Sequence, residues 1–153
     1  MKPWVVAALT IGADQFSKAV VRATLNPTQH LPLVPFLHLT YVQNTGTAFG
    51  LFRGHPGVFI ALSVAVGAWI IVEWRRSHAD APRATRHALA LILGGAIGNL
   101  IDRVRFGYVV DFIDLRVWPV FNVADSAITI GVGWLLLQLL WKGQGTRSKE
   151  QEQ

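Results

Sequence analysis

The chain has no cysteine and little charge: only 15% of its 153 residues are Asp, Glu, Lys or Arg, against about 25% in soluble domains. The lack of cysteine excludes disulfides, thiolate metal sites and a cysteine nucleophile. The lack of charge argues against a water-soluble globule, while a hydrophobic content of 52% excludes intrinsic disorder. At this length we expect one domain, residues 1–153.

The charges that are present are mostly basic, giving a net charge of +5 and a pI of about 10.2. A nucleic-acid-binding protein gathers basic residues on one face. Here they lie between apolar runs, as in membrane proteins whose loop charges set orientation. We therefore expect membrane lipids, and no nucleic acid, as partners. The five histidines show no metal-ligand spacing, so we expect neither a metal nor another cofactor.

Four apolar runs set the expected architecture: an all-α membrane protein with four transmembrane helices. Their expected bounds are about 4–22, 56–73, 87–104 and 122–141, followed by a polar tail at 143–153 that we expect to be disordered. A span needs about 20 apolar residues, and only the second run approaches this length without a charged residue. Two spans with buried amphipathic helices therefore remain an alternative.

Loop charge predicts the orientation. With four spans, eight basic residues fall on one side of the membrane, namely Lys2, Arg75, Arg76, Arg83, Arg86, Lys142, Arg147 and Lys149. Five fall on the other side, namely Arg22, Arg53, Arg103, Arg105 and Arg116. The positive-inside rule then places both termini in the cytoplasm. The first apolar run lacks a convincing cleavage site, so we expect it to be retained as a helix and not removed as a signal peptide.

The stretch from Ala23 to His55 then lies outside the cell. Its three prolines discourage helix, whereas Phe36–Gln43 partly alternates and is rich in strand formers. We expect a small β-rich extracytoplasmic cradle between the first two helices. Glycines at 46, 50, 54 and 57 would permit this loop to move.

Polar side chains occur where a membrane makes them costly. A carboxylate within a bilayer costs at least ~2.5 kcal/mol. With the orientation above, the polar residues of three helices converge on the outer leaflet; they are Asp14, Lys18, Asn99, Asp102, Arg103, Asn122 and Asp125. Asp111 lies in a short apolar connection between the third and fourth helices. This convergence indicates a functional site.

Structural explanations compete for most of these residues. Asp14 and Lys18 are four residues apart and could simply neutralise each other. Asn122 suits an N-cap with Asp125 in the first turn, and Arg103 could be an interfacial anchor. Three glycines in the third helix suit close helix packing; they are Gly94, Gly95 and Gly98. Asp111 has no such explanation.

Two carboxylates at a membrane surface, in a chain without thiols, suggest an aspartyl dyad. Two close carboxylates cannot both ionise readily, so they share one proton. The ionised member can accept a proton from water while the protonated member polarises a scissile carbonyl. Sequence spacing alone does not bring Asp111 and Asp125 together.

Five blocks of residues follow one another along the chain: Asp14–Lys18, Asn44–Phe49, Gly94–Arg103, Val110–Phe112 and Phe121–Asp125. With these blocks in this order, the chain resembles signal peptidase II, the lipoprotein signal peptidase family of bacteria. The resemblance covers roughly residues 4 to 141. It implies an intramembrane aspartic endopeptidase of the bacterial inner membrane. Its substrates would be diacylglyceryl-modified prolipoproteins, cut just before the lipidated cysteine at the extracytoplasmic face.

The resemblance also implies roles for individual residues. Asp111 and Asp125 match the catalytic aspartates of the family. Polar residues that surround the site and hold substrate are matched by Asn44, Gly46, Asn99, Arg103 and Asn122. Positions that support the site are matched by Asp14, Lys18 and Asp102. Nothing in the sequence demands an oligomer, and we expect a monomer.

Two other functions are weighed against this one. A small ion- or proton-coupled membrane transporter subunit would use intramembrane aspartates as a relay across the bilayer. A purely structural four-helix membrane protein would leave the outer polar cluster without an explanation.

Overall fold

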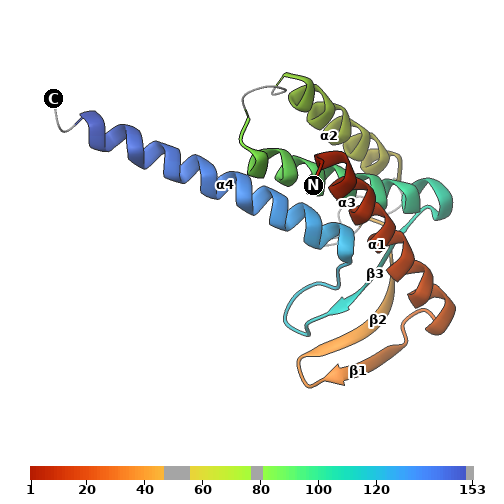
Figure 1. The fold of residues 1–153 in the computed structure, drawn as a ribbon. Coiled ribbons are helices and arrows are strands. Elements are labelled where there is room, and N and C mark those ends of the chain that lie inside the picture. The colour runs from red at the N-terminus through yellow and green to blue at the C-terminus, as the bar shows by residue number, and fades with distance from the viewer. Residues whose placement is uncertain (47–55, 77–80, 151–153) are drawn as a thin grey trace.

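The computed structural model describes residues 1–46, 56–76 and 81–150. The described chain forms four helices and three strands in the order α1, β1, β2, α2, α3, β3 and α4 (Figure 1). The helices are α1 (Pro3–Thr24), α2 (Pro56–Arg76), α3 (Arg83–Phe106) and α4 (Val123–Glu150). The strands are β1 (His30–Val34), β2 (Leu37–Asn44) and β3 (Val109–Asp114). Each predicted helix is present, and the mostly helical architecture with a small sheet is confirmed.

Helix α3 is central, since it packs against each of the other three helices. Its glycines permit this close packing. A Cβ on Gly94 would lie 2.8 Å from Thr10 Cβ of α1, and one on Gly95 would lie 2.8 Å from Ile128 Cγ1 of α4. The glycines are therefore packing residues, as predicted, because small residues let helix backbones approach in a membrane.

Two described helices are long and apolar enough to cross a membrane, on length and composition alone: α3 and the Val123–Trp141 part of α4. The apolar window of α3 is 50% buried, whereas that of α4 is only 17% buried. Helix α4 thus exposes large apolar side chains, among them Ile130, Leu136, Leu139, Leu140 and Trp141. Lipid is the natural neighbour for such a surface.

Helix α4 also runs further than expected. It continues to Glu150, where the sequence predicted a disordered tail from 143 onwards. Lys, Gln, Arg and Glu are good helix formers, and no proline interrupts this stretch. Residues 151–153 lie outside the described chain.

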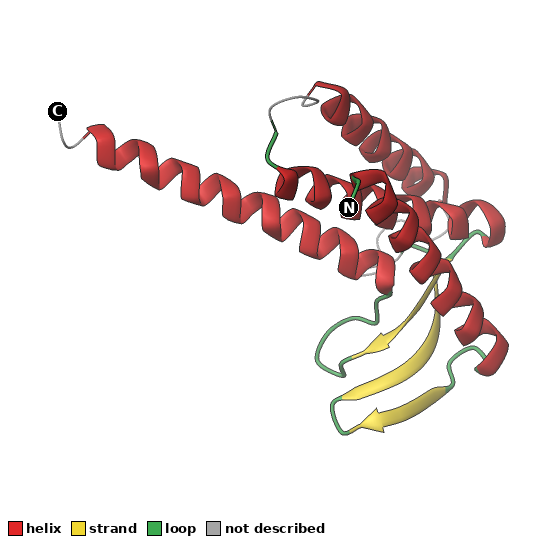
Figure 2. Cartoon of the chain, in the orientation of Figure 1, coloured by secondary structure: helices red, strands yellow, loops and turns green. Residues whose placement is uncertain are grey.

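The three strands form one antiparallel sheet in the order β1-β2-β3 (Figure 2). The expected strand in the outer loop is β2. Strand β3 comes from the connection between α3 and α4, which the sequence indicated only as an apolar link. Because β3 is almost wholly buried, it shows no alternation of polar and apolar residues. The sheet packs on the end of α1 through a small core made of Val21, Tyr41, Val110 and Phe112.

Gly95 provides a test of this packing. We predict that Gly95→Ala lowers stability by about 1–3 kcal/mol, since the added methyl meets Ala124 and Ile128 of α4. Gly133→Ala is the matched control, because a Cβ there meets nothing within 4 Å. Thermal unfolding of both variants in detergent measures the difference, and equal melting temperatures would contradict the prediction.

Candidate active site

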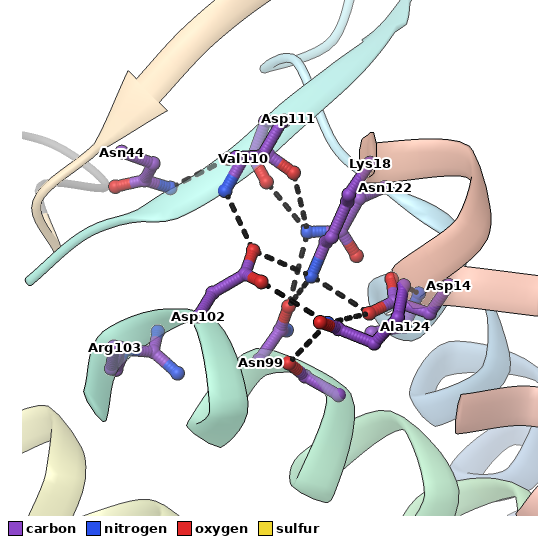
Figure 3. Close-up of polar contacts among 12 residues, drawn as sticks. Asp14, Lys18, Asn44, Asn99, Asp102, Arg103, Val110, Asp111, Asn122 and Ala124 are labelled. Atoms are coloured by element: carbon purple, nitrogen blue, oxygen red, sulfur yellow. Dashed lines mark hydrogen bonds and ion pairs between the residues drawn. The ribbon is translucent and has the colours of Figure 1, made fainter. Parts of the chain in front are cut away.

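A polar cluster lies where the sheet meets the helices, between α1, α3, β3 and the start of α4 (Figure 3). At its centre is Lys18 of α1, whose side chain is fully buried. Lys18 Nζ lies 2.9 Å from Asp14 Oδ2 and 3.1 Å from Asp102 Oδ2. Both carboxylates are fully buried as well. The predicted pairing of Asp14 with Lys18 is present, and Asp102 of α3 makes it a triad.

Each carboxylate of this triad also accepts a backbone hydrogen bond from another secondary-structure element. Asp14 Oδ1 accepts the backbone N–H of Ala124 in the first turn of α4, at 2.9 Å. Asp102 Oδ2 accepts the backbone N–H of Val110 in β3, at 3.0 Å. A carboxylate at a helix N-terminus is favourable because it satisfies free N–H groups. The triad therefore ties α1, α3, β3 and α4 together.

Gln15 is a further member of the cluster that sequence reasoning did not single out. Its Nε2 donates to Asp14 Oδ2 at 3.2 Å, Asp102 Oδ1 at 3.1 Å and the carbonyl of Gly98 at 3.1 Å. Its position directly after Asp14 was the available signal in the sequence. Because adjacent residues on a helix point in different directions, that position did not predict that Gln15 would join the cluster.

Asn99 connects the triad to Asp125. Lys18 donates to Asn99 Oδ1 at 2.8 Å, and Asn99 Nδ2 donates to Asp125 Oδ1 at 2.8 Å. An ammonium group can only donate, so the amide oxygen must face Lys18 and the NH2 must face Asp125. The buried cation thereby sets the orientation of a donor aimed at a candidate catalytic carboxylate.

Asn122 connects the two candidate catalytic carboxylates. The backbone N–H of Asp125 donates to Asn122 Oδ1 at 2.9 Å. In return, the backbone N–H of Asn122 donates to Asp125 Oδ2 at 3.3 Å. This is the N-cap arrangement that the sequence indicated. Its Nδ2 also donates to Asp111 Oδ1 at 2.7 Å. Asn122 therefore serves both as a helix cap and as a bridge between Asp111 and Asp125.

Asp111 lies on β3 and is only 2% exposed. Its Oδ2 accepts a hydrogen bond from Asn44 Nδ2 of the neighbouring strand at 2.8 Å. Burial raises the pKa of the Asp111 carboxyl to about 7, with the negative charge of Asp125 adding to the effect. The hydrogen bonds from Asn44 and Asn122 act in the opposite direction and lower that pKa. Asp111 thus has a pKa suited to holding a proton near neutrality.

The side chain of Asn44 is itself fixed by Gly46. The backbone N–H of Gly46 donates to Asn44 Oδ1 at 2.9 Å. Gly46 has a φ of 98°, a conformation open to glycine but strained for other residues. The rest of the second sequence block, and the glycines at 50 and 54, lie in the segment 47–55, outside the described residues.

Asp125 has a different environment from Asp111. It is partly exposed and lines a cavity of about 350 Å³. The other residues of this cavity are Leu115, Trp118, Phe121, Ser126, Thr129 and Ile130. One carboxylate of the pair is therefore enclosed, while the other opens towards a mainly apolar space. This asymmetry is what a division between a proton holder and a water activator requires.

Arg103 follows Asp102 on α3, and its Nη1 donates to Ser63 Oγ of α2 at 3.3 Å. It lies beside the cluster in Figure 3. No group of three or more His, Asp or Glu among the described residues could hold a metal ion. The polar groups gather where the last turns of α3 and the first turn of α4 meet β3, whereas a transporter relay needs them spaced across the bilayer.

Comparisons with known proteins indicate the family of the chain. A family model described as signal peptidase (SPase) II matches residues 6–141. A lipoprotein signal peptidase of Moorella thermoacetica is 52% identical over 136 residues, covering 88% of this chain and 90% of the relative. A lipoprotein signal peptidase of Halothermothrix orenii is 41% identical over 137 residues, covering 89% of this chain and 93% of the relative.

Solved structures add to these relatives. A bacterial membrane enzyme of known structure superposes with a TM-score of 0.86 at 31% identity, covering 94% of this chain and 90% of that one. A second bacterial membrane enzyme superposes with a TM-score of 0.82 at 32% identity, covering 90% of this chain and 92% of that one. On this sequence and structural similarity, the chain belongs to the signal peptidase II family.

Proposed function

We propose that this chain removes the signal peptide of lipoprotein precursors by aspartic peptidase chemistry, with Asp111 and Asp125 as the catalytic pair. The family supports the reaction class. The observation that carries the assignment of residues is the bridge of Asn122, which bonds to both carboxylates at once. In addition, Asn44 donates a hydrogen bond to Asp111, and Asn99 donates one to Asp125.

The two environments suggest the division of labour. Asp111, buried and with a pKa of about 7, holds the proton. Asp125, which faces the cavity, acts as the base and accepts a proton from water. The water oxygen attacks the scissile carbonyl carbon while Asp111 gives its proton to the carbonyl oxygen. Collapse of the tetrahedral intermediate breaks the C–N bond, the amine nitrogen takes the proton from Asp125, and Asp111 recovers its own.

The surrounding residues have supporting roles in this proposal. Asn44, Gly46, Asn99, Arg103 and Asn122 hold the substrate backbone and the two carboxylates. The triad of Lys18, Asp14 and Asp102 fixes the positions of α1, α3, β3 and α4. A fixed set of donors stabilises charge as it develops in the transition state, without reorganisation.

The apolar cavity beside Asp125 suits a lipid-bearing substrate. We propose a diacylglyceryl-modified prolipoprotein, cut just before the lipidated cysteine, because acyl chains in a bilayer would hold the bond at the level of the site. The enzyme would then be a monomer of the bacterial inner membrane, folded as one domain whose four helices all span. Both termini would be cytoplasmic and the site extracytoplasmic, as loop charge predicts.

Substitution of the two aspartates tests the proposal. We expect Asp111→Asn and Asp125→Asn each to reduce cleavage of a diacylglyceryl-modified prolipoprotein by about 10³-fold or more, since neither proton role survives. Asp114→Asn is the matched control, because Asp114 lies on the same strand but bonds to Thr40 and Arg116 instead. Full cleavage by either folded dyad variant would refute the assignment of that residue.

The pH dependence tests which aspartate holds the proton. Because the working form needs Asp111 protonated, we predict that kcat/KM falls as pH rises through about 7. The hydrogen bond from Asn44 lowers the pKa of Asp111, so Asn44→Ala should move this alkaline limb to higher pH. A pH profile of both enzymes measures it. An alkaline limb that stays in place or moves to lower pH would show that Asp111 does not hold the proton.

A further inference from the structure

We propose that a basic cavity at the far end of α3 from the catalytic pair binds the phosphate headgroup of an anionic phospholipid. The cavity has a volume of about 420 Å³ and lies between the start of α1 and the first turns of α3. Its lining residues are Met1, Lys2, Pro3, Arg83, Arg86 and His87. Figure 1 shows the beginning of the chain beside this end of α3.

The charge of this cavity is of one sign. Three side chains of its lining are cations, and none is a carboxylate. Within the described ranges neither Lys2, Arg83 nor Arg86 forms a salt bridge. Arg86 Nε is buried and has no hydrogen-bond partner among the described residues. An anion in the cavity would pair with these cations, and hydrogen bonds between arginine and a phosphate are strengthened by charge.

The start of α3 adds to this field. Pro82, the N-cap residue, provides no side-chain hydrogen bond, and the first turn contains no acidic residue. The first N–H groups of a helix are unpaired and carry the positive end of the helix dipole. Arginine side chains and free backbone N–H groups together are the donor set that phosphate prefers.

The depth of the cavity favours a lipid phosphate. Arg86 and Asp102 are sixteen residues apart on α3, which corresponds to about 24 Å at about 1.5 Å per residue. The hydrocarbon core of a bilayer is about 30 Å thick. With the catalytic cluster at one membrane surface, as the proposed function requires, the cavity lies near the headgroups of the opposite surface.

An apolar cavity adjoins the basic one. His87 lines both, and the second cavity, of about 280 Å³, lies between α3 and α4. Its other residues are Ala84, Ala88, Leu91, Ile130 and Trp134. A headgroup in the basic cavity would therefore have an apolar surface beside it for the start of an acyl chain. A free phosphate has no acyl chain and would leave this second cavity unfilled.

Thermal unfolding of the whole protein in detergent micelles tests the inference without relying on catalysis. Added phosphatidylglycerol should raise the melting temperature of the wild type, since a ligand of the folded state stabilises it. Phosphatidylcholine and soluble glycerophosphoglycerol should raise it much less. In Arg83→Gln/Arg86→Gln the apparent affinity for phosphatidylglycerol should fall about tenfold or more.

A charge-matched variant serves as the control. Arg75→Gln/Arg76→Gln removes two cations from the last turn of α2 and leaves the basic cavity unchanged. It should respond to phosphatidylglycerol as the wild type does. An equal loss in both double variants would reduce the effect to general charge attraction and overturn the site. A full response to glycerophosphoglycerol would overturn the lipid and leave a site for a free phosphodiester.

Two further checks separate the possible causes of failure. If Arg83→Gln/Arg86→Gln does not fold, the single variants Lys2→Gln and Arg86→Lys carry the test. Lys2→Gln should weaken the response and Arg86→Lys should largely keep it; a response unchanged by Lys2→Gln would contradict the inference. The Asp111→Asn variant should bind the lipid as the wild type does, so a failed cleavage assay and a failed lipid assay are distinguishable.

Discussion

The buried ion pairs of Lys18 with Asp14 and Asp102 are the constraint on which the rest of the site depends. Folding removes these three charged side chains from water, and the desolvation of each costs roughly several kcal/mol of free energy. Their mutual attraction offsets that cost only if the geometry is held closely. Helices α1 and α3 therefore have one permitted register at this level, and the glycines of α3 let the helices approach closely enough to satisfy it. Removing one member of the triad would leave an uncompensated buried charge, which is strongly destabilising.

Two amides connect this triad to Asp111 and Asp125, the proposed catalytic pair. Asn99 is oriented by Lys18, and its NH2 therefore points at Asp125. Asn122 donates to Asn99 Oδ1 at 3.1 Å as well as to Asp111, so its orientation follows from the same cation. Neutral amides thus pass the order of a charged centre on to these two carboxylates. The positive charge of Lys18 lowers the pKa of Asp111, but burial is the larger effect and raises it.

Local features of the site were predictable from the sequence, and long-range ones were not. The pairing of Asp14 with Lys18 and the capping by Asn122 follow from spacings of three and four residues. The meeting of Asp111 with Asn122 depends on β3, whose run of buried residues has no strand-like alternation. Gln15 was missed because its partners are on α3, more than eighty residues away. The resemblance to a family supplied a hypothesis that local rules could not, namely that Asp111 and Asp125 form a catalytic pair.

Backbone pairing after the turn at 115–120 brings the start of α4 next to β3, the two elements that carry the proposed catalytic aspartates. Phe121 and Ile113 exchange backbone hydrogen bonds of 2.7 and 3.1 Å, which return the chain to β3 after the turn at 115–120. Asn122 follows directly, so its distance from Asp111 is set by backbone pairing and does not depend on the flexible side chains of the turn. The same step starts α4, whose first turn holds Asp125. The turn can therefore vary in its exposed residues, such as Val117 and Trp118, while the two carboxylates keep their relation. Exposed apolar side chains therefore lie on the turn that leads into the proposed site, where the proposed lipid-bearing substrate would need apolar surface.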